Sequence, residues 1–257
     1  MSIHQHYRKD EHRFVDQILE WLQTVKDTYS YKRSGFLDPR EQEIAAQLVA
    51  YDGETNVFFC GGGPQVERKR AIFAPDYFNP QTEDFDLVCF EVNYPDKFVT
   101  VTHRNLLGSL MSLGLKREKF GDILIRGKTV QFVASRDISD YLLTNVQAVG
   151  KTSVSLREVP LADLIVPDEQ WKEFSETFSS LRLDVVIAEM FRLSRANAVS
   201  YIQAGNVKVN WRVIESPAYA CHVHDTISVK GYGRGKLLDV QGKTKKGKWR
   251  VQYGIKQ

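Results

Sequence analysis

The first fifty residues contain two segments in which apolar side chains recur every three or four positions. This spacing lines one face of a helix with apolar groups and therefore predicts amphipathic helices. The first segment covers residues 3–29, with apolar positions Phe14, Ile18, Trp21, Leu22 and Val25. Residues 29–37 are expected to be a connector. Asp38 and Pro39 then have the residue types of an N-cap and a first helical turn, so a second helix is predicted through about Tyr51.

Short apolar runs at residues 56–60 and 71–73 predict two strands that complete a small α/β domain over residues 1–80. Between these strands lie the glycines of residues 61–63 and the charged run 67–70. The Gly-Lys-Ser/Thr ending of a phosphate-binding P-loop does not follow the glycines. We therefore interpret this segment as a tight turn beside surface charges.

The pattern changes over residues 83–160, where short apolar strands alternate with amphipathic helices. The predicted elements are a strand at 87–92, a helix at 104–113, strands at 122–125 and 129–134, a helix at 138–146 and a strand at 152–157. The order β-α-β-β-α-β is that of the ferredoxin-like fold, which RNA-recognition-motif (RRM) domains share. The aromatic RNP1 run of RRM domains is missing from the expected central strands. The fold analogy therefore predicts no mode of binding.

The last third of the chain is expected to hold a linker, a third domain and a tail. Residues 161–180 are an acidic linker with a helix predicted from Asp168, and residues 181–240 are the third domain. Residues 241–257 are a basic, glycine-containing tail that we expect to become ordered on RNA. The predicted fold class is α+β, built from three small domains.

Two short helices are predicted in the third domain, at residues 184–193 and 195–204. Ser194 suits the N-cap of the second helix, and Gly205 can end it in a left-handed conformation. From residue 207, apolar and polar side chains alternate, which predicts a strand with one buried face. This arrangement resembles the S4 RNA-binding domain. The resemblance implies a basic surface on the paired helices and the adjoining hairpin that grips folded RNA through its phosphates.

The resemblance is carried by residues spread along the whole third domain. They are Arg182, Asp184, Ser194, Arg195, Ala198, Gly205, Val207, Val209, Asn210, Asp225, Ile227 and Val229. The sequence departs from the S4 pattern at Trp211, where a glycine usually completes an Asn-Gly turn, and at His224, where a glycine usually precedes Asp225.

The residues that we expect to contact RNA are Arg182, Ser194, Arg195, Lys208, Asn210, Trp211, Arg212, Lys230, Arg234 and Lys236. Each cation has the alternative of a solvated surface charge, and Arg182 that of an ion pair with Asp184. Ser194 and Asn210 also suit structural roles. Trp211 suits either stacking on an unpaired base or packing on the hairpin. The glycines of residues 231–235 suit either close approach to phosphate or a flexible exit loop.

The charge of the chain is unevenly distributed. Residues 181–257 contain 14 Lys and Arg against 5 Asp and Glu, a net charge of +9, whereas residues 1–180 contain 21 against 27, a net charge of −6. A basic segment on an otherwise acidic chain is typical of a domain that meets a polyanion, although surface charge for solubility is the simpler alternative.

Several classes of function have no support in the sequence. The three cysteines show no CxxC spacing and the six histidines no metal-binding spacing, so we expect reduced thiols and neither a metal nor a cofactor. No apolar run is long enough to span a bilayer, and the first residues lack a signal core, so we expect a cytoplasmic protein. No catalytic residue is predicted. The loose candidates for an active site are Asp86, Glu91, His103, Arg104 and Asp122.

Over nearly its whole length the chain resembles the YlmH family, through residues 36–41, 61–63 with 67–70, 207–211 and 231–234 and through the middle domain. Trp211 is consistent with that family. The resemblance implies a bacterial, cytoplasmic RNA-binding protein, often encoded near cell-division genes. It also implies association with the large ribosomal subunit, contacts to ribosomal RNA and peptidyl-tRNA, and a role in rescuing stalled translation.

Two alternatives stay open. Residues 181–184 look like the Arg-Leu-Asp of pseudouridine synthases, which often carry an S4 domain, but they are better explained as the start of a helix. An RNA-modifying enzyme that uses its S4 domain for delivery is nevertheless one alternative. An interaction protein linked to cell division is the other.

Overall fold

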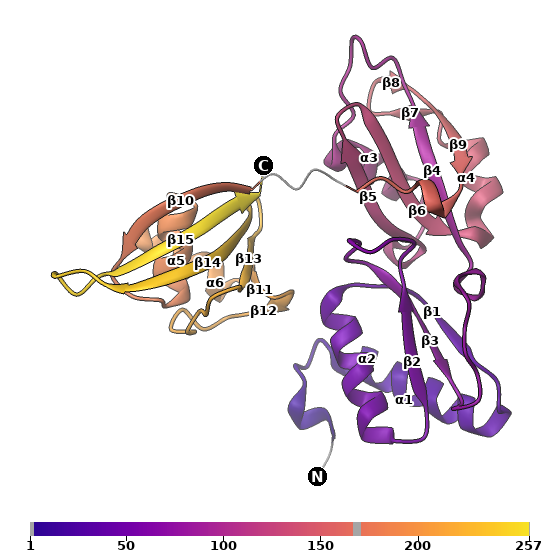
Figure 1. Ribbon diagram of the computed structural model, residues 1–257, viewed down its shortest axis with the longest axis horizontal. Coiled ribbons are helices and arrows are strands. Elements are labelled where there is room, and N and C mark those ends of the chain that lie inside the picture. Colours follow the sequence, from indigo (N-terminus) through magenta and orange to yellow (C-terminus); the bar gives the residue numbers. More distant parts are fainter. Residues whose placement is uncertain (1–2, 167–170, 257) are drawn as a thin grey trace. The chain divides into compact units, whose positions relative to one another are not determined.

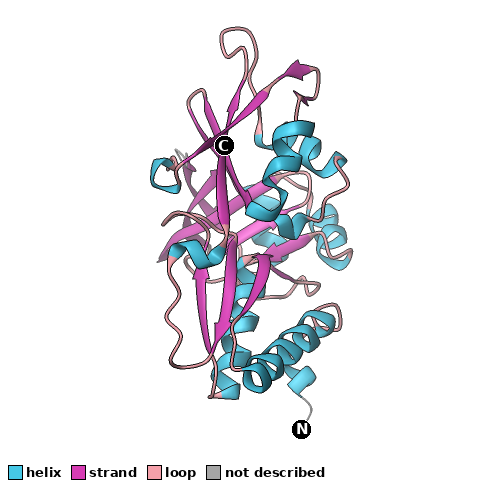
Figure 2. Cartoon of the chain, turned by 90° about the vertical axis from the view of Figure 1, so that its right-hand side faces the viewer, coloured by secondary structure: helices cyan, strands magenta, loops and turns pink. Residues whose placement is uncertain are grey.

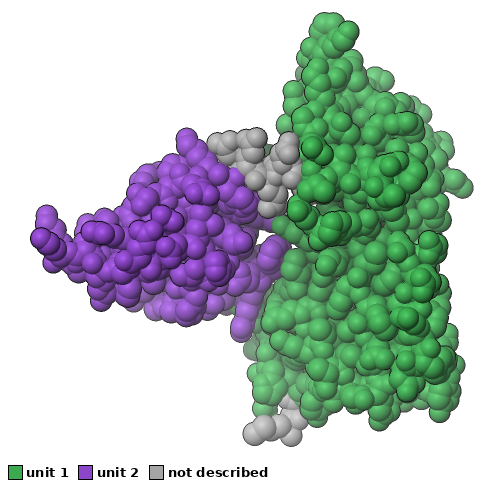
Figure 3. Space-filling view, in the orientation of Figure 1, with its two compact units in different colours: residues 1–168 green, residues 169–257 purple. Residues whose placement is uncertain are grey.

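The computed structural model describes residues 3–166 and 171–256, and the chain forms two compact units, residues 1–168 and 169–257. Figure 1 shows the course of the chain, and Figure 3 shows the two units in different colours. Helices and strands occur in both units, and Figure 2 colours them differently along the chain, so the fold class is α+β, as predicted. Among the described residues, no helix is both long and apolar enough to cross a membrane.

The first unit begins with two helices that cover a three-stranded antiparallel sheet of order β1-β3-β2. The elements are η1 (Ile3–His6), α1 (His12–Thr28), β1 (Lys32–Leu37), α2 (Pro39–Asp52), β2 (Asn56–Cys60) and β3 (Lys69–Ala74). The single helix predicted over residues 3–29 is therefore wrong at its start, where a 3-10 turn precedes α1. The connector predicted up to Leu37 is also wrong, because Ser34 and Phe36 are buried in β1 and alternate with half-buried positions, a period-two pattern within a short polar run.

The start of α2 follows the prediction. The carboxylate of Asp38 accepts a hydrogen bond from the Glu41 N–H (2.9 Å), and the Glu41 carboxylate accepts one from the Asp38 N–H (2.7 Å). This reciprocal capping box, with Pro39 in the first turn, satisfies backbone donors that the helix itself leaves unpaired.

The middle of the chain forms a four-stranded antiparallel sheet of order β5-β6-β4-β9, the strand order of the ferredoxin-like fold. The elements are η2 (Thr82–Phe85), β4 (Leu87–Asn93), α3 (His103–Ser112), η3 (Arg117–Lys119), β5 (Phe120–Arg126), β6 (Thr129–Ser135), η4 (Arg136–Ile138), α4 (Ser139–Asn145), β7 (Ala148–Val149), β8 (Thr152–Ser153), β9 (Ser155–Val159) and η5 (Leu161–Asp163). The last predicted strand begins too early, because Thr152 and Ser153 pair with β7 instead.

The two faces of this sheet are covered by different parts of the first unit. On one face, Phe90 and Phe132 pack with α3 and α4 in a core that includes Leu106. On the other face, Leu87 and Val133 pack with side chains of the N-terminal sheet and of η5, namely Phe36, Ile72, Ala74, Phe58, Cys60, Leu161 and Leu164. Because both faces are covered, the N-terminal and middle domains share a continuous core.

The second unit is a six-stranded antiparallel sheet of order β10-β15-β14-β13-β11-β12, with two helices packed on one face. Its elements are β10 (Trp171–Phe178), α5 (Leu183–Met190), α6 (Arg195–Gln203), β11 (Val207–Val209), β12 (Arg212–Val213), β13 (Thr226–Val229), β14 (Gly233–Lys243) and β15 (Trp249–Lys256). The core of this unit includes Val186, Ile202, Val207, Ile227 and Tyr253.

Two predictions for this part of the chain are wrong. The helix predicted from Asp168 begins outside the described residues, and Trp171–Phe178 is strand β10, with the Phe174 ring stacked on that of Tyr253 at 5.2 Å between centroids. The predicted tail is largely strand: β15 lies between β10 and β14, and Val251 and Tyr253 are buried. Apolar residues at every second position from 249 to 255 produce this strand, and the surrounding lysines and glycines hide the period.

Candidate nucleic-acid interface

The starts of α5 and α6 bring two of the predicted arginines to one carboxylate. Arg182 donates from Nε to Asp184 Oδ1 at 3.1 Å, and Arg195 donates from Nη2 to Asp184 Oδ2 at 3.2 Å. The Asp184 side chain is only 5% exposed, whereas those of Arg182 and Arg195 are 47% and 60% exposed. The buried carboxylate therefore holds two guanidinium groups near each other at the surface. We call these two residues the arginine pair.

The ion-pair alternative for Arg182 is thus confirmed, and it applies to Arg195 as well. Burial raises the pKa of Asp184, but hydrogen bonds from the arginine pair outweigh burial and hold the pKa below its usual value. Asp184 is therefore charged at neutral pH and compensates one of two positive charges. The pair keeps a net charge of +1 and exposed donors, which suits a phosphate group.

Ser194 precedes the arginine of α6 and has a structural task. Its hydroxyl oxygen accepts a hydrogen bond from the Asn197 N–H at 3.2 Å, which confirms the predicted N-cap. Ser194 thereby fixes where Arg195 leaves the first turn. Gly205 follows the helix with φ of +69°, as predicted for its end.

Strands β11 and β12 are joined by a two-residue turn in which Asn210 and Trp211 have φ of +49° and +64°. Positive φ at both central positions defines a type I′ turn, which normally favours glycine at the second position. The Asn210 amide donates to Asp225 (2.8 Å) and accepts from the Thr226 N–H (2.9 Å), so its side chain ties the turn to β13. His224, the other departure from the S4 pattern, has φ of +74°.

Trp211 adopts a strained conformation without a matching gain in the core. A left-handed conformation costs a residue other than glycine about 1–2 kcal/mol. The indole is half-buried, and the Arg234 guanidinium carbon lies 5.5 Å from its ring centre. Trp211 therefore packs on the hairpin through a cation–π contact and keeps part of its ring accessible for stacking.

The strand register places other predicted cations on the sheet face that is turned away from the helices. Lys208 opposes Ser228, which in turn opposes Arg234, and Lys236 opposes Thr226. The residues between them point into the core: Val207 and Ile227 are fully buried, and a Cβ on Gly235 would lie 2.9 Å from the sulfur of Met190 in α5. Gly235 therefore allows α5 to pack closely on the sheet, and it does not make room for a ligand.

Arg212 and Lys230 do not belong to this sheet face. Arg212 opposes Val209, whose side chain is in the core, so Arg212 belongs to the helix side of the hairpin. Lys230 is exposed in the turn between β13 and β14, and its N–H donates to the Asn206 carbonyl at 3.0 Å. Tyr232 in the same turn packs edge-on against Tyr201 of α6 at 5.5 Å, so this run is an ordered turn and strand.

The predicted RNA-contact residues therefore occupy two faces of one unit. The face that carries the helices holds Arg182, Ser194, Arg195 and Arg212. The face turned away from the helices, which we call the open face, holds Lys208, Trp211, Arg234 and Lys236. Strand β15, which was not predicted, extends this open face. Lys256 opposes Trp171 there, and a Cβ on Gly254 would lie 3.1 Å from the Trp171 Cβ. The period-two pattern of residues 249–255 was the available signal.

The loose active-site candidates in the middle domain do not converge. Asp86 binds Arg33 at 3.0 Å, and Glu91 binds Arg157 at 2.7 Å. Asp122 accepts from the backbone N–H groups of residues 67 and 68, and burial raises its pKa. His103 and Arg104 lie at the start of α3. Each carboxylate thus has a separate structural partner.

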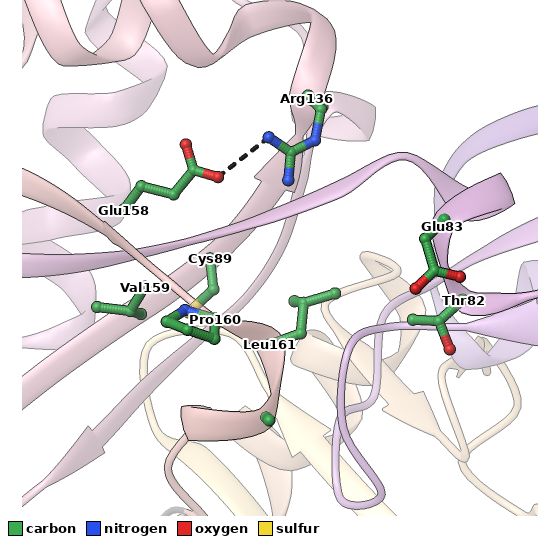
Figure 4. Close-up of a pocket in the computed structure, with 9 residues that line it drawn as sticks. Thr82, Glu83, Cys89, Arg136, Glu158, Val159, Pro160 and Leu161 are labelled. Atoms are coloured by element: carbon green, nitrogen blue, oxygen red, sulfur yellow. Dashed lines mark hydrogen bonds and ion pairs between the residues drawn. The ribbon is translucent and has the colours of Figure 1, made fainter.

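A pocket lies beside β9, and Figure 4 shows the residues that line it. Arg136 and Glu158 form an ion pair at 3.0 Å on one side, and Cys89 lies below. Burial raises the pKa of the Cys89 thiol to about 12, so it is protonated at neutral pH and a poor nucleophile. No group of three or more His, Cys, Asp or Glu side chains among the described residues could hold a metal ion.

Comparisons with known proteins agree with this geometry. Residues 181–227 match the S4 domain, residues 10–78 match the N-terminal domain of YlmH, and residues 80–163 match a domain described as "Putative RNA-binding domain in YlmH". The ribosome-associated protein quality control protein P2 of Bacillus subtilis is 46% identical over 252 residues, which cover 98% of each chain. This chain belongs to the YlmH family.

A solved YlmH structure extends the comparison to the fold. The cell division protein ylmH from Streptococcus pneumoniae is 29% identical and matches with a TM-score of 0.55, covering 64% of this chain and all of that one. The predicted YlmH and S4 resemblances are therefore confirmed. The contact residues within the S4 domain stay predictions.

Proposed function

We propose that this YlmH-family chain is a non-catalytic cytoplasmic protein that binds structured ribosomal RNA and peptidyl-tRNA on the large ribosomal subunit when translation has stalled. The observation that carries this proposal is the arginine pair on the buried carboxylate of Asp184, within a matched S4 domain. Its donors are exposed and held in place, as recognition of phosphates requires. The name of the Bacillus subtilis relative supports the ribosomal setting.

The distribution of charge supports the same proposal. The net charge of +9 over residues 181–257 raises the local concentration of this unit near ribosomal RNA, and the acidic remainder leaves the S4 domain as the favoured contact. The absence of convergent titratable groups among the described residues of the middle domain supports a binding role over an enzymatic one.

Co-sedimentation with separated large and small subunits over a salt series tests the proposal. Arg182→Glu with Arg195→Glu removes the arginine pair, and the matched control is Arg13→Glu with Lys32→Glu, two exposed cations of the first unit. We expect salt-sensitive binding to large subunits. Loss of two phosphate contacts should also flatten the slope of log affinity against log salt by roughly 1.5.

A second double variant, Lys208→Glu with Arg234→Glu, reports separately on the open face of the sheet. Weakened binding by the arginine-pair variant, with the control unchanged, supports the S4 domain as the anchor. Equal binding by all variants would refute it. Chemical modification of RNA by the wild type that is lost when Glu91 or Asp122 is replaced would favour the RNA-modifying enzyme.

The name of the Streptococcus pneumoniae relative, a cell division protein, favours one other candidate function, a role in cell division. That candidate requires a protein partner that binds independently of RNA. Capture of a division protein that is retained by the arginine-pair variant and by nuclease-treated samples would support it.

A further inference from the structure

The middle domain matches a family domain described as RNA-binding, yet the sheet face that RRM domains use is covered. Leu87 and Val133 on that face are 3% and 0% exposed and pack against the N-terminal sheet. The neighbouring Gln131 is 2% exposed, and its amide oxygen accepts a hydrogen bond from the Ile165 N–H at 2.8 Å. RNA can reach this domain only at another surface.

We propose that the middle domain binds single-stranded RNA at the end of its sheet where β4 stops. Phe98 would stack on an unpaired base, while Lys97, Arg104, Arg126, Lys128 and Lys151 would contact the phosphates. We call this surface the distal end. The inference rests on the proposed RNA-binding function and adds to it a site in the first unit, separate from the S4 domain.

Phe98 is the most exposed of the large apolar side chains described, at 87%. Its loop is nevertheless ordered: the N–H groups of Phe98 and Val99 donate to the Pro95 carbonyl at 3.0 and 3.2 Å. The loop returns to the core at Val101, which is 2% exposed. An exposed ring on a hydrogen-bonded turn is a preformed platform, which limits the entropy lost when a base stacks on it.

The loop is also attached to the neighbouring hairpin. The Tyr94 hydroxyl donates to the Lys128 carbonyl at 2.8 Å, and the Lys128 ammonium lies 3.3 Å from the Asp96 carboxylate. These contacts hold Phe98 and Lys97 close to the turn between β5 and β6. The Lys128 side chain stays 66% exposed despite its ion pair.

The topology brings the remaining cations to the same end. Asn93, the last residue of β4, opposes Ser155, the first residue of β9. The β5–β6 turn, the start of α3 with Arg104, and the β7–β8 turn with Lys151 therefore gather there, as the upper part of Figure 1 shows. The Gly150 N–H donates to the Ser109 hydroxyl at 3.2 Å, which fixes the β7–β8 turn beside α3.

The charge of the distal end contrasts with that of its unit. Residues 1–168 contain 20 Lys and Arg against 24 Asp and Glu, a net charge of −4. The distal end contains five cations and one carboxylate, Asp96, a net charge of +4. A local reversal of charge around an exposed aromatic ring fits a polyanion with stacking bases. A membrane surface fits less well, because Phe98 and Val99 are the only exposed large apolar side chains among the described residues of the distal end.

The test uses the full chain in the Arg182→Glu, Arg195→Glu background, so that the arginine pair does not mask the distal end. The probe is fluorescent single-stranded oligouridine, followed by anisotropy over a salt series. Phe98→Ala should weaken binding roughly fivefold to 150-fold, the range for loss of one stacked base, whereas Phe98→Tyr should retain it. Lys97→Glu with Lys128→Glu should weaken binding and flatten its salt dependence.

Tyr51→Ala is the matched control, because Tyr51 is 79% exposed on α2 and lies in the same unit. All these side chains are exposed, and circular dichroism would confirm that the variants fold. Unchanged affinity for oligouridine in both distal-end variants, or no binding by the parent, would overturn the inference. So would a loss of binding to phosphatidylserine vesicles without a loss of RNA binding. Failure of the proposed function is seen separately, in the subunit co-sedimentation of the arginine-pair variant.

Discussion

Replacing Asp184 with asparagine removes the charge that holds the arginine pair while keeping the size and shape of the side chain. Three hydrogen bonds join the guanidinium groups to the carboxylate, two from Arg182 and one from Arg195, and bonds to charged groups contribute about 1.5–3 kcal/mol each. The arginine side chains are 47% and 60% exposed, so water recovers part of that energy in the variant. We expect Asp184→Asn to lower the free energy of unfolding by about 2 kcal/mol.

The pH dependence of this effect follows from the pKa of Asp184. The folded-state pKa lies below the usual value of 3.8, so the stabilisation is present above that value and is lost as the pH falls through the folded-state pKa. The difference between wild type and Asp184→Asn should therefore be constant near neutral pH and shrink only in acid, below about pH 4.

Urea denaturation of the full chain measures this difference. Three of the four tryptophans lie in the second unit, so fluorescence reports mainly on its unfolding. The decisive comparison repeats Asp184→Asn in an Arg182→Gln, Arg195→Gln background. There the carboxylate is buried without its partners, so the same change should be neutral or stabilising. Equal destabilisation in both backgrounds would refute the view that the arginines compensate Asp184.

Three further predictions concern Trp211 and Tyr253 in the second unit and Cys89 in the first. Trp211→Gly should leave the free energy of unfolding within about 1 kcal/mol of wild type, because relief of the left-handed conformation offsets the lost cation–π contact; a decrease in RNA affinity in the same variant would assign the ring to binding. Tyr253→Ala should destabilise the second unit by about 3–5 kcal/mol in urea denaturation, as for other large aromatic side chains in cores, whereas an unstructured tail would show no change. Cys89, with a pKa of about 12, should react with a maleimide at pH 7 only at the rate of unfolding; because the half-buried Cys60 can react in the native chain, labelling is assigned by peptide mapping, and fast labelling of Cys89 itself would contradict its burial.

Local signals predicted the structure correctly where the physical cause was local. Asp38 and Ser194 each cap a helix through a backbone N–H three residues away, and Gly205 ends a helix through its own φ. Such features depend on neighbours in the chain and on no distant contact. The ferredoxin-like order was predictable for the same reason, because each strand and helix of the middle domain has a clear period.

Composition gave a wrong prediction where the burial signal was weak. Residues 241–257 contain several lysines and glycines, which indicate a disordered tail, but Trp249, Val251, Tyr253 and Ile255 have the period of a strand. The alternation from residue 207 predicted a polar strand face that holds Lys208, but the division of all the contact residues between two faces could not be predicted. It depends on the register that pairs Lys208 with Ser228 and Arg212 with Val209, and register is a property of the pairing between strands.

The covered sheet of the middle domain accounts for the absence of the aromatic RNP1 run from the sequence. In RRM domains the exposed sheet face carries aromatic side chains that stack on bases, and their absence here leaves aliphatic Leu87 and Val133 at that face. Aliphatic side chains gain by burial and offer bases no π-face, so they suit packing against the N-terminal sheet. The missing RNP1 run and the core shared by the N-terminal and middle domains therefore have the same cause. An aromatic contact between this domain and RNA has to come from its loops. Phe98 is the most exposed of the large apolar side chains described, and it lies on such a loop.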